Sequence, residues 1–143
     1  MESSWQVFAI VSVILFLKLL STSIVQGLVR IKTKTFRWKE DAEFFTNSFP
    51  ATDDHTIVAT ANGVFRNDLE NIPIFLFLLI GYIQTYSWHE GAIIYSGIFI
   101  VSRILHAIFY FLHKQPWRNI AYDLGILSKL LLSGHIVHSV FFA

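Results

Sequence analysis

Four long apolar segments constrain this chain more than any other feature of its sequence. A helix needs about 20 predominantly apolar residues to cross the hydrocarbon core of a bilayer. Four windows meet this requirement, at residues 5–29, 69–86, 91–112 and 117–142. The chain is 54% hydrophobic and has a mean hydropathy of +0.54, which exceeds the usual composition of a water-soluble domain. We therefore predict an all-α integral membrane protein, a four-helix bundle that forms one domain over residues 1–143.

The first apolar segment has the features of a retained span rather than of a cleaved secretory leader. A leader begins with a basic region and has an apolar stretch of about 7–15 residues. Residues 5–29 form a longer stretch with no basic residue before it, and Arg30, Lys32 and Lys34 follow it. We expect this segment to be the first membrane span.

The distribution of lysine and arginine predicts the orientation, because cytoplasmic loops retain cationic residues. The cations outside the spans follow the first segment or lie between the third and fourth, at Arg30, Lys32, Lys34, Arg37, Lys39, Lys114 and Arg118. The opposite side carries only Glu2 and Glu90. The prediction is a multi-pass protein with lumenal termini and a cytosolic loop over residues 30–55.

Turn and capping residues predict where the helices begin and end. Gly91 and Pro116 separate the last three spans, and the short connections between these spans require antiparallel neighbours. Asp53 and Asp54 are candidate N-caps of a second helix that runs from about residue 54 to 86. Such a helix is longer than the membrane is thick, so its first turns are expected to project into the cytosol.

Charge and composition exclude several classes of function. The net charge of +1 and pI near 8.1 do not provide the clustered excess of cations that nucleic-acid binding requires. The chain has no cysteine, so it has neither a disulfide nor a thiolate ligand of its own. Its histidines are scattered over different levels, so we predict no metal site and no Ser-His-Asp arrangement.

Ionisable residues inside the predicted spans indicate a functional interior, since each costs roughly 2.5–3.5 kcal/mol to insert. They are Lys18, Glu70, Arg103, His106, Asp123, Lys129, His135 and His138. Lys18 and Lys129 are more simply interpreted as packing or snorkelling residues, and the last two histidines as interfacial ones. A Glu70–Arg103 ion pair between helices and a binding role for both residues are equally compatible with the sequence.

Polar side chains share faces at one depth on three of the predicted helices. Residues three, four or seven apart lie on the same side of a helix. This spacing groups Arg103, His106 and Tyr110; Arg118 and Tyr122; and Arg66, Asn67 and Glu70. Together they predict a cytosol-facing cavity rich in cationic donors, which suits a small ligand with carboxylates.

Four groups of residues form a recognisable series of motifs. The most specific is the run Arg-Asn-Asp-Leu-Glu-Asn-Ile-Pro at residues 66–73, followed by Phe-Leu-Phe at 75–77. The others are residues 29–32 with 40–42, 103–106 with Tyr110, and 116–118 with Tyr122. In order and approximate spacing the series resembles the motifs of the MAPEG family, which contains the microsomal glutathione transferases and prostaglandin E synthase. The resemblance covers nearly the whole chain and is closest to the branch of microsomal glutathione transferase one and prostaglandin E synthase.

The resemblance implies a homotrimer in the endoplasmic reticulum membrane, or also the mitochondrial outer membrane, with glutathione bound between subunits near the cytosolic side. By the same resemblance Arg118 lies nearest the thiol and is the catalytic residue, and Asp41 orients that arginine. The implied glutathione-binding positions are Arg30, Arg66, Asn67, Glu70, Arg103, His106, Tyr110 and Tyr122.

The chain also departs from the family pattern before the Asn-Asp pair. Residues 58–65 read Val-Ala-Thr-Ala-Asn-Gly-Val-Phe and lack an acid, two arginines and a histidine of that pattern. Gly63 is expected to loosen this helix by up to about 1 kcal/mol. Asn119 stands where prostaglandin E synthase has a serine beside its arginine, which disfavours a strict prostaglandin synthase.

The resulting hypothesis is a membrane-bound glutathione transferase that joins glutathione, as co-substrate, to hydrophobic electrophiles from the lipid bilayer. Reduction of lipid hydroperoxides is a second reaction of the same thiol. The alternatives are a non-catalytic tetraspan assembly protein, whose polar interior only pairs helices, and a glutathione-dependent prostaglandin E synthase.

Overall fold

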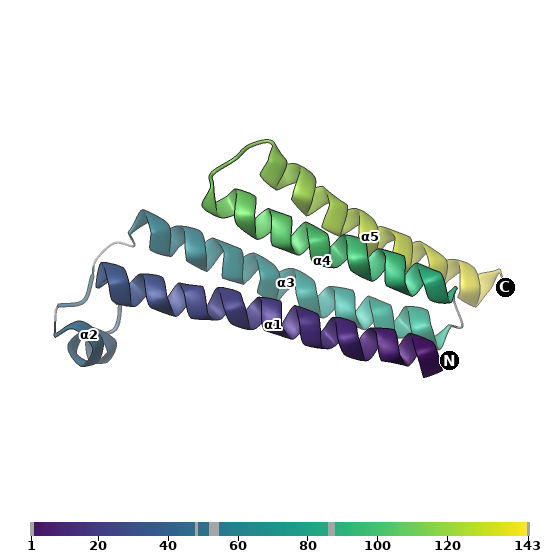
Figure 1. Ribbon diagram of the computed structural model, residues 1–143, viewed down its shortest axis with the longest axis horizontal. Coiled ribbons are helices and arrows are strands. Elements are labelled where there is room, and N and C mark those ends of the chain that lie inside the picture. The colour runs from purple at the N-terminus through teal and green to yellow at the C-terminus, as the bar shows by residue number, and fades with distance from the viewer. Residues whose placement is uncertain (1, 48, 52–54, 86–87, 143) are drawn as a thin grey trace.

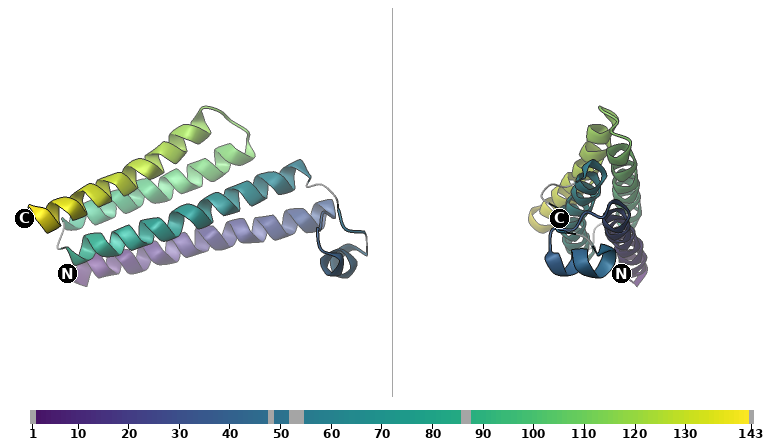
Figure 2. Two further views of the ribbon diagram at one scale, coloured as in Figure 1. Left: turned by 180° about the vertical axis from the view of Figure 1, so that it is seen from behind. Right: turned by 90° about the vertical axis from the view of Figure 1, so that its left-hand side faces the viewer.

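The structure is a computed structural model that describes residues 2–47, 49–51, 55–85 and 88–142. The described residues contain five helices. They are α1 (Glu2–Thr33), α2 (Lys39–Thr46), α3 (Thr56–Gln84), α4 (His89–Phe111) and α5 (Trp117–Phe141). Four are long and lie side by side, whereas the short α2 lies across their direction at one end (Figures 1 and 2). The two ends of the chain lie together at the other end of the bundle (Figure 1). The all-α prediction is confirmed.

Among the described residues, three helices are long and apolar enough to cross a membrane by length and composition, at residues Ser3–Thr33, His89–Phe111 and Trp117–Phe141. They correspond to the first, third and fourth predicted spans. The second predicted span lies in α3, which is not among the three. Asn67, Asp68, Glu70 and Asn71 precede its apolar run and lower its hydropathy. A fourth crossing by α3 therefore stays a prediction.

Helix boundaries agree with the sequence at Pro116 and differ at Gly91. Pro116 is the N-cap residue of α5, as expected of a residue that cannot continue a helix from before it. Gly91, expected between two helices, lies in the first turn of α4 instead. A Cβ atom at Gly91 would lie 2.8 Å from Cε3 of Trp88, so the residue permits close packing rather than a break.

The N-cap of α3 is His55, whose side chain accepts a hydrogen bond from the Ile57 amide. The two expected capping residues, Asp53 and Asp54, lie outside the described residues. The helix spans 29 residues and continues through Pro73. At 1.5 Å per residue it is roughly 44 Å long, which supports the expectation that it exceeds the thickness of the hydrocarbon core.

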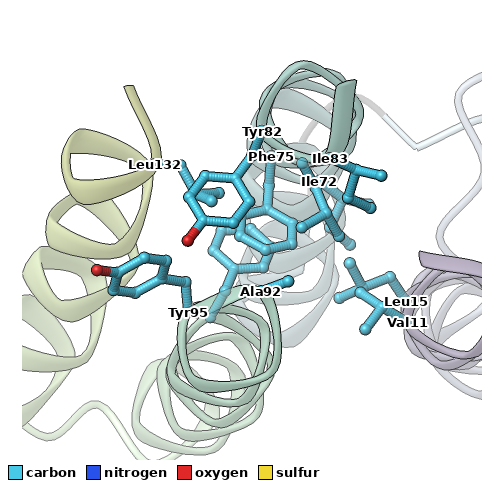
Figure 3. Packing of buried hydrophobic residues seen from close by; sticks show 11 residues of the cluster. Val11, Leu15, Ile72, Phe75, Tyr82, Ile83, Ala92, Tyr95 and Leu132 are labelled. Carbon is cyan, nitrogen blue, oxygen red and sulfur yellow. The ribbon is translucent and has the colours of Figure 1, made fainter. Parts of the chain in front are cut away.

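The apolar core fills the half of the bundle that contains the termini. Side chains of α1, α3, α4 and α5 meet there, and aromatic rings from α3 and α4 occupy its centre (Figure 3). Phe75 and Phe99 stack with ring centroids 4.0 Å apart, and the rings of Tyr82 and Tyr95 meet edge to face at 6.0 Å. α1 packs chiefly on α3 and α4 chiefly on α5, and α3 also contacts α4 and α5. α4 also contacts α1, so α3 and α4 both meet every other long helix.

Candidate functional site

Beyond the apolar core, α3 presents polar side chains to each of the other long helices. Three hydrogen bonds reach one stretch of α3 from three different helices. They run from Lys18 of α1 to Asp68, from Arg103 of α4 to Asn67 over 2.6 Å, and from Lys129 of α5 to Asn71 over 2.6 Å. A buried polar group is costly unless it is paired, so these contacts fix the register of all four helices.

This polar layer has more cations than anions. Lys18, Arg103 and Lys129 contribute positive charge, and Asp68, which is fully buried, is the carboxylate bonded among them. The amides Asn67 and Asn71 accept hydrogen bonds but carry no charge. An excess of positive charge in a poorly solvated interior is offset when an anion binds next to it. The layer is thus electrostatically suited to an anionic ligand.

Arg103 is the largest fully buried side chain, with 1% of its surface exposed. Its guanidinium lies 5.5 Å from the ring centre of Phe99 and 5.6 Å from that of Tyr122. Gly125 of α5 leaves room for it, because a Cβ atom there would lie 2.9 Å from Nη2 of Arg103. α3, α4 and α5 therefore hold this cation in one position.

The ion pair between Glu70 and Arg103 that the sequence allowed is not formed. Glu70 accepts from Arg66 at 2.9 Å, four residues earlier on the same helix, and the two side chains are 57% and 81% exposed. Arg103 instead bonds to Asn67. Within this chain Arg66 and Glu70 therefore lie on the outer surface of α3, apart from the buried polar layer, so the structure does not bring these two candidates together with the others.

Three aromatic candidates form a cluster next to Arg103. The ring of His106 lies 5.5 Å from that of Tyr110 and 5.9 Å from that of Tyr122. His106 is buried, and its Nδ1 atom has no hydrogen-bond partner in the described residues. An unsatisfied buried nitrogen is expected to find a partner when a ligand arrives, so it marks a candidate contact.

Arg118 lies over Tyr110 in the first turn of α5. Its guanidinium carbon is 4.8 Å from the ring centre, which is within cation–π distance. When the side-chain amide of Gln115 is oriented with its oxygen towards Arg118, that oxygen accepts from Arg118 Nε at 3.2 Å and from Nη2 at 2.5 Å. Aromatic stacking and an amide acceptor thus hold the guanidinium, while Arg118 stays partly accessible.

Gly63 provides the space in which Tyr110 sits. A Cβ atom at Gly63 would clash with the Tyr110 hydroxyl and would lie 2.9 Å from Cζ of its ring. The sequence interpretation treated Gly63 only as a weak point of the helix. The structure adds a packing reason for glycine at this position, one helix away from the aromatic cluster.

Arg30 reaches α3 through Asn62. Its Nη2 donates to Asn62 Oδ1 over 3.2 Å, and Gln26 donates to the same oxygen over 2.6 Å. The Nε atom of Arg30 is buried without a hydrogen-bond partner in the described chain. Asn62 belongs to the segment that departs from the expected motif, so this segment supplies a neutral partner for Arg30.

Asp41 lies in α2, and the described residues contain no ion pair between it and Arg118. The predicted orienting role for Asp41 is therefore not met within one chain. The main residue of the observed site that the sequence did not predict is Asp68. Its signal was the spacing of four and seven residues that places it with Val64 and Phe75 on the buried face of α3.

Two comparisons with known proteins bear on this site. The sequence profile of the MAPEG family matches residues 8–138. Prostaglandin E synthase of Bos taurus is 27% identical over 133 residues, which cover 91% of this chain and 85% of that protein.

Proposed function

Because the chain belongs to the MAPEG family, which includes glutathione-dependent transferases and isomerases, we propose that it is a membrane-bound glutathione transferase. It conjugates glutathione to hydrophobic electrophiles that reach it from the bilayer, and reduces lipid hydroperoxides with the same thiol. The observation that carries the proposal is the excess of cations around the buried Arg103, beside an aromatic cluster and a held but accessible Arg118.

Glutathione fits the groups that the structure places at this end of the bundle. It is a small peptide with two carboxylates, and Arg30 and Arg103 offer guanidinium groups that pair well with carboxylates. The unpartnered Nε of Arg30 and Nδ1 of His106 are polar atoms that a peptide ligand can satisfy. In this proposal Asn67, Tyr110 and Tyr122 orient the peptide.

Arg118 is the proposed catalytic residue. A free thiol has a pKa of about 8.5, so most of it is protonated and unreactive at neutral pH. A permanent positive charge beside the sulfur favours the thiolate, and each pKa unit corresponds to about 1.4 kcal/mol. The thiolate then forms a carbon–sulfur bond to the electrophile, the leaving group departs with its electron pair, and the thiol proton passes to water.

The proposal includes assembly and location. A homotrimer in the endoplasmic reticulum membrane, with lumenal termini and the Arg118 turn on the cytosolic side, gives glutathione access from the cytosol. In such a trimer the outer Arg66–Glu70 surface of α3 and the Asp41 side chain of α2 face other subunits. This accounts for why they do not meet the remaining candidates within one chain.

Binding and turnover of the purified protein test the proposal. We expect saturable glutathione binding below about 1 mM, in the usual range of substrate affinity, and conjugation of a generic aryl halide. The variant Arg118→Leu should lose conjugation activity, whereas Lys114→Leu, which removes an exposed cation from the same turn, should keep it. Absence of binding at millimolar glutathione would favour the alternative of a non-catalytic tetraspan assembly protein.

A glutathione-dependent prostaglandin E synthase is the second candidate, because the bovine relative carries that name. Asn119 stands where, by the resemblance, prostaglandin E synthase has a serine, and this difference argues against that activity. Incubation with a prostaglandin endoperoxide and glutathione, followed by product analysis, separates the two. Isomerisation faster than aryl halide conjugation would favour the synthase.

A further inference from the structure

The short helix α2 carries a group of exposed aromatic side chains. Trp38 directly precedes it and is 71% exposed, while Phe44 and Phe45 within it are 83% and 51% exposed. The rings of Phe44 and Phe45 meet edge to face at 5.0 Å. Large aromatic groups left in water are unfavourable, so an exposed cluster of this kind calls for a partner.

Packing fixes the direction in which Phe44 points. Ala42 is fully buried, and the ring of Phe45 stacks on that of the buried Phe36 with centroids 5.5 Å apart. A backbone hydrogen bond of 2.8 Å from Ala51 to Phe36 ties the chain after α2 to the chain before it. At about 100° per residue Phe44 lies nearly opposite Ala42, so the same contacts that hold α2 direct Phe44 outward.

Exposed apolar residues also run along the end of α1 that precedes the aromatic group. Ile24, Leu28 and Ile31 are 52%, 60% and 44% exposed on the last turns of α1, which is one of the membrane-crossing candidates. Five residues separate the end of α1 from the start of α2. α2 lies across the long helices at this end (Figures 1 and 2), so a membrane crossed by α1 has its surface close to α2.

Basic residues lie between these apolar residues and the aromatic group. They are Lys32, Lys34 and Arg37, whereas Lys39 of α2 pairs with Glu43 over 3.6 Å. Tryptophan and other aromatic side chains concentrate at the level of the lipid headgroups, and each basic residue near an anionic leaflet contributes roughly 1 kcal/mol of attraction. The cations precede α2, whereas the helix itself carries Lys39 and the acids Glu40, Asp41 and Glu43, so its attraction to the bilayer comes from its aromatic side chains and from the basic residues before it.

We propose that α2 docks on the surface of the membrane, with Phe44, Phe45 and Trp38 in the headgroup region and the basic residues against anionic phospholipid. This role is independent of glutathione. This interaction anchors the segment between α1 and α3, which does not itself cross the membrane, at the bilayer surface. The partner is lipid, and contact with a second copy of the chain is the competing occupant that the experiment separates.

The absence of cysteine makes the test direct, because a single cysteine can be introduced without removing others. Phe44→Cys and Lys39→Cys are spin-labelled in the full chain and reconstituted into vesicles of phosphatidylcholine and phosphatidylserine. Lys39 lies about 140° away around α2 and is exposed, so it is the matched control. Accessibility to oxygen, which concentrates in lipid, and to a water-soluble nickel chelate is measured by electron paramagnetic resonance.

We expect the ratio of oxygen to nickel accessibility to be severalfold higher at Phe44→Cys than at Lys39→Cys. Low accessibility to both reagents at Phe44→Cys would show contact with another copy, and high nickel accessibility would show exposure to water. Either result overturns the proposal. As a second readout, lipids brominated near the headgroup should quench less of the total fluorescence after Trp38→Phe, and unchanged quenching contradicts membrane docking by that residue.

Discussion

Removing the carboxylate of Asp68 tests whether the buried polar layer holds the helices together. Asp68 is fully buried and pairs with Lys18, whose side chain is 12% exposed. Thr22 also donates to the same oxygen, Oδ2, at 3.3 Å, while Oδ1 has no partner in the described chain. The variant Asp68→Asn keeps the size and the polar character of the side chain and leaves the Lys18 ammonium without a counter-charge.

The expected loss of unfolding free energy is about 3 kcal/mol. Breaking a buried ion pair by removing one partner costs about 3–5 kcal/mol. The lower end applies because Oδ1 is already unsatisfied and the partly exposed Lys18 can move its ammonium towards water. In contrast, Lys18→Met combined with Asp68→Asn removes both charges, so the double variant should be more stable than Asp68→Asn alone.

Unfolding in mixed micelles by a denaturing detergent, followed by far-ultraviolet circular dichroism, measures the free energy of each variant. Glu43→Gln is the control, because Glu43 forms an exposed pair with Lys39 at 3.6 Å, which is expected to contribute at most about 1 kcal/mol. Additive losses in the double variant would refute the reasoning, since two groups that interact must show a coupling energy.

Three further predictions concern the proposed glutathione site. Arg103→Ala should weaken glutathione binding by roughly 2–5 kcal/mol, measured by calorimetry, and unchanged affinity would make this residue purely structural. Arg118→Leu should lower turnover more than it weakens glutathione binding, and its rate should partly recover as the pH rises towards about 9. Arg118→Lys should have an intermediate rate, because lysine keeps the charge but lacks the planar group of donors. If the thiolate absorbance of bound glutathione has the same pH midpoint in the wild type and in Arg118→Leu, Arg118 does not act on the thiol. Gly63→Ala should displace Tyr110 and lower kcat/KM, whereas Gly27→Ala, with open space around it, should leave kcat/KM unchanged.

The sequence predicted the four long helices because long apolar windows are local signals, but it did not predict the short α2 within the loop expected over residues 30–55. It also placed Arg103 with His106 and Tyr110, since residues three and seven apart on one helix share a face whatever surrounds them. In the structure the ring of His106 lies beside that of Tyr110 on the same helix and beside that of Tyr122 on α5. Local periodicity therefore identified which side chains share a face.

The partners of these side chains could not be predicted, because pairing depends on the rotation of each helix about its own axis. Asn67 and Glu70 are only about 60° apart around α3, so the sequence placed them together. In the structure the boundary between interior and surface passes between them, and Arg103 bonds to Asn67 while Glu70 bonds to Arg66. A rotation smaller than one residue of helix would reverse this choice.

The segment that departs from the family motif bears most directly on whether the site can bind an anion. Residues 58–65 supply Asn62, which accepts from Arg30, and Gly63, which accommodates Tyr110. Both are uncharged, and among the described residues no carboxylate pairs with Arg30. A carboxylate in place of Asn62 would neutralise Arg30 and compete with a ligand carboxylate for its guanidinium. The neutral Asn62 thus orients Arg30 without neutralising it, which is the state in which a guanidinium gains most from a bound carboxylate.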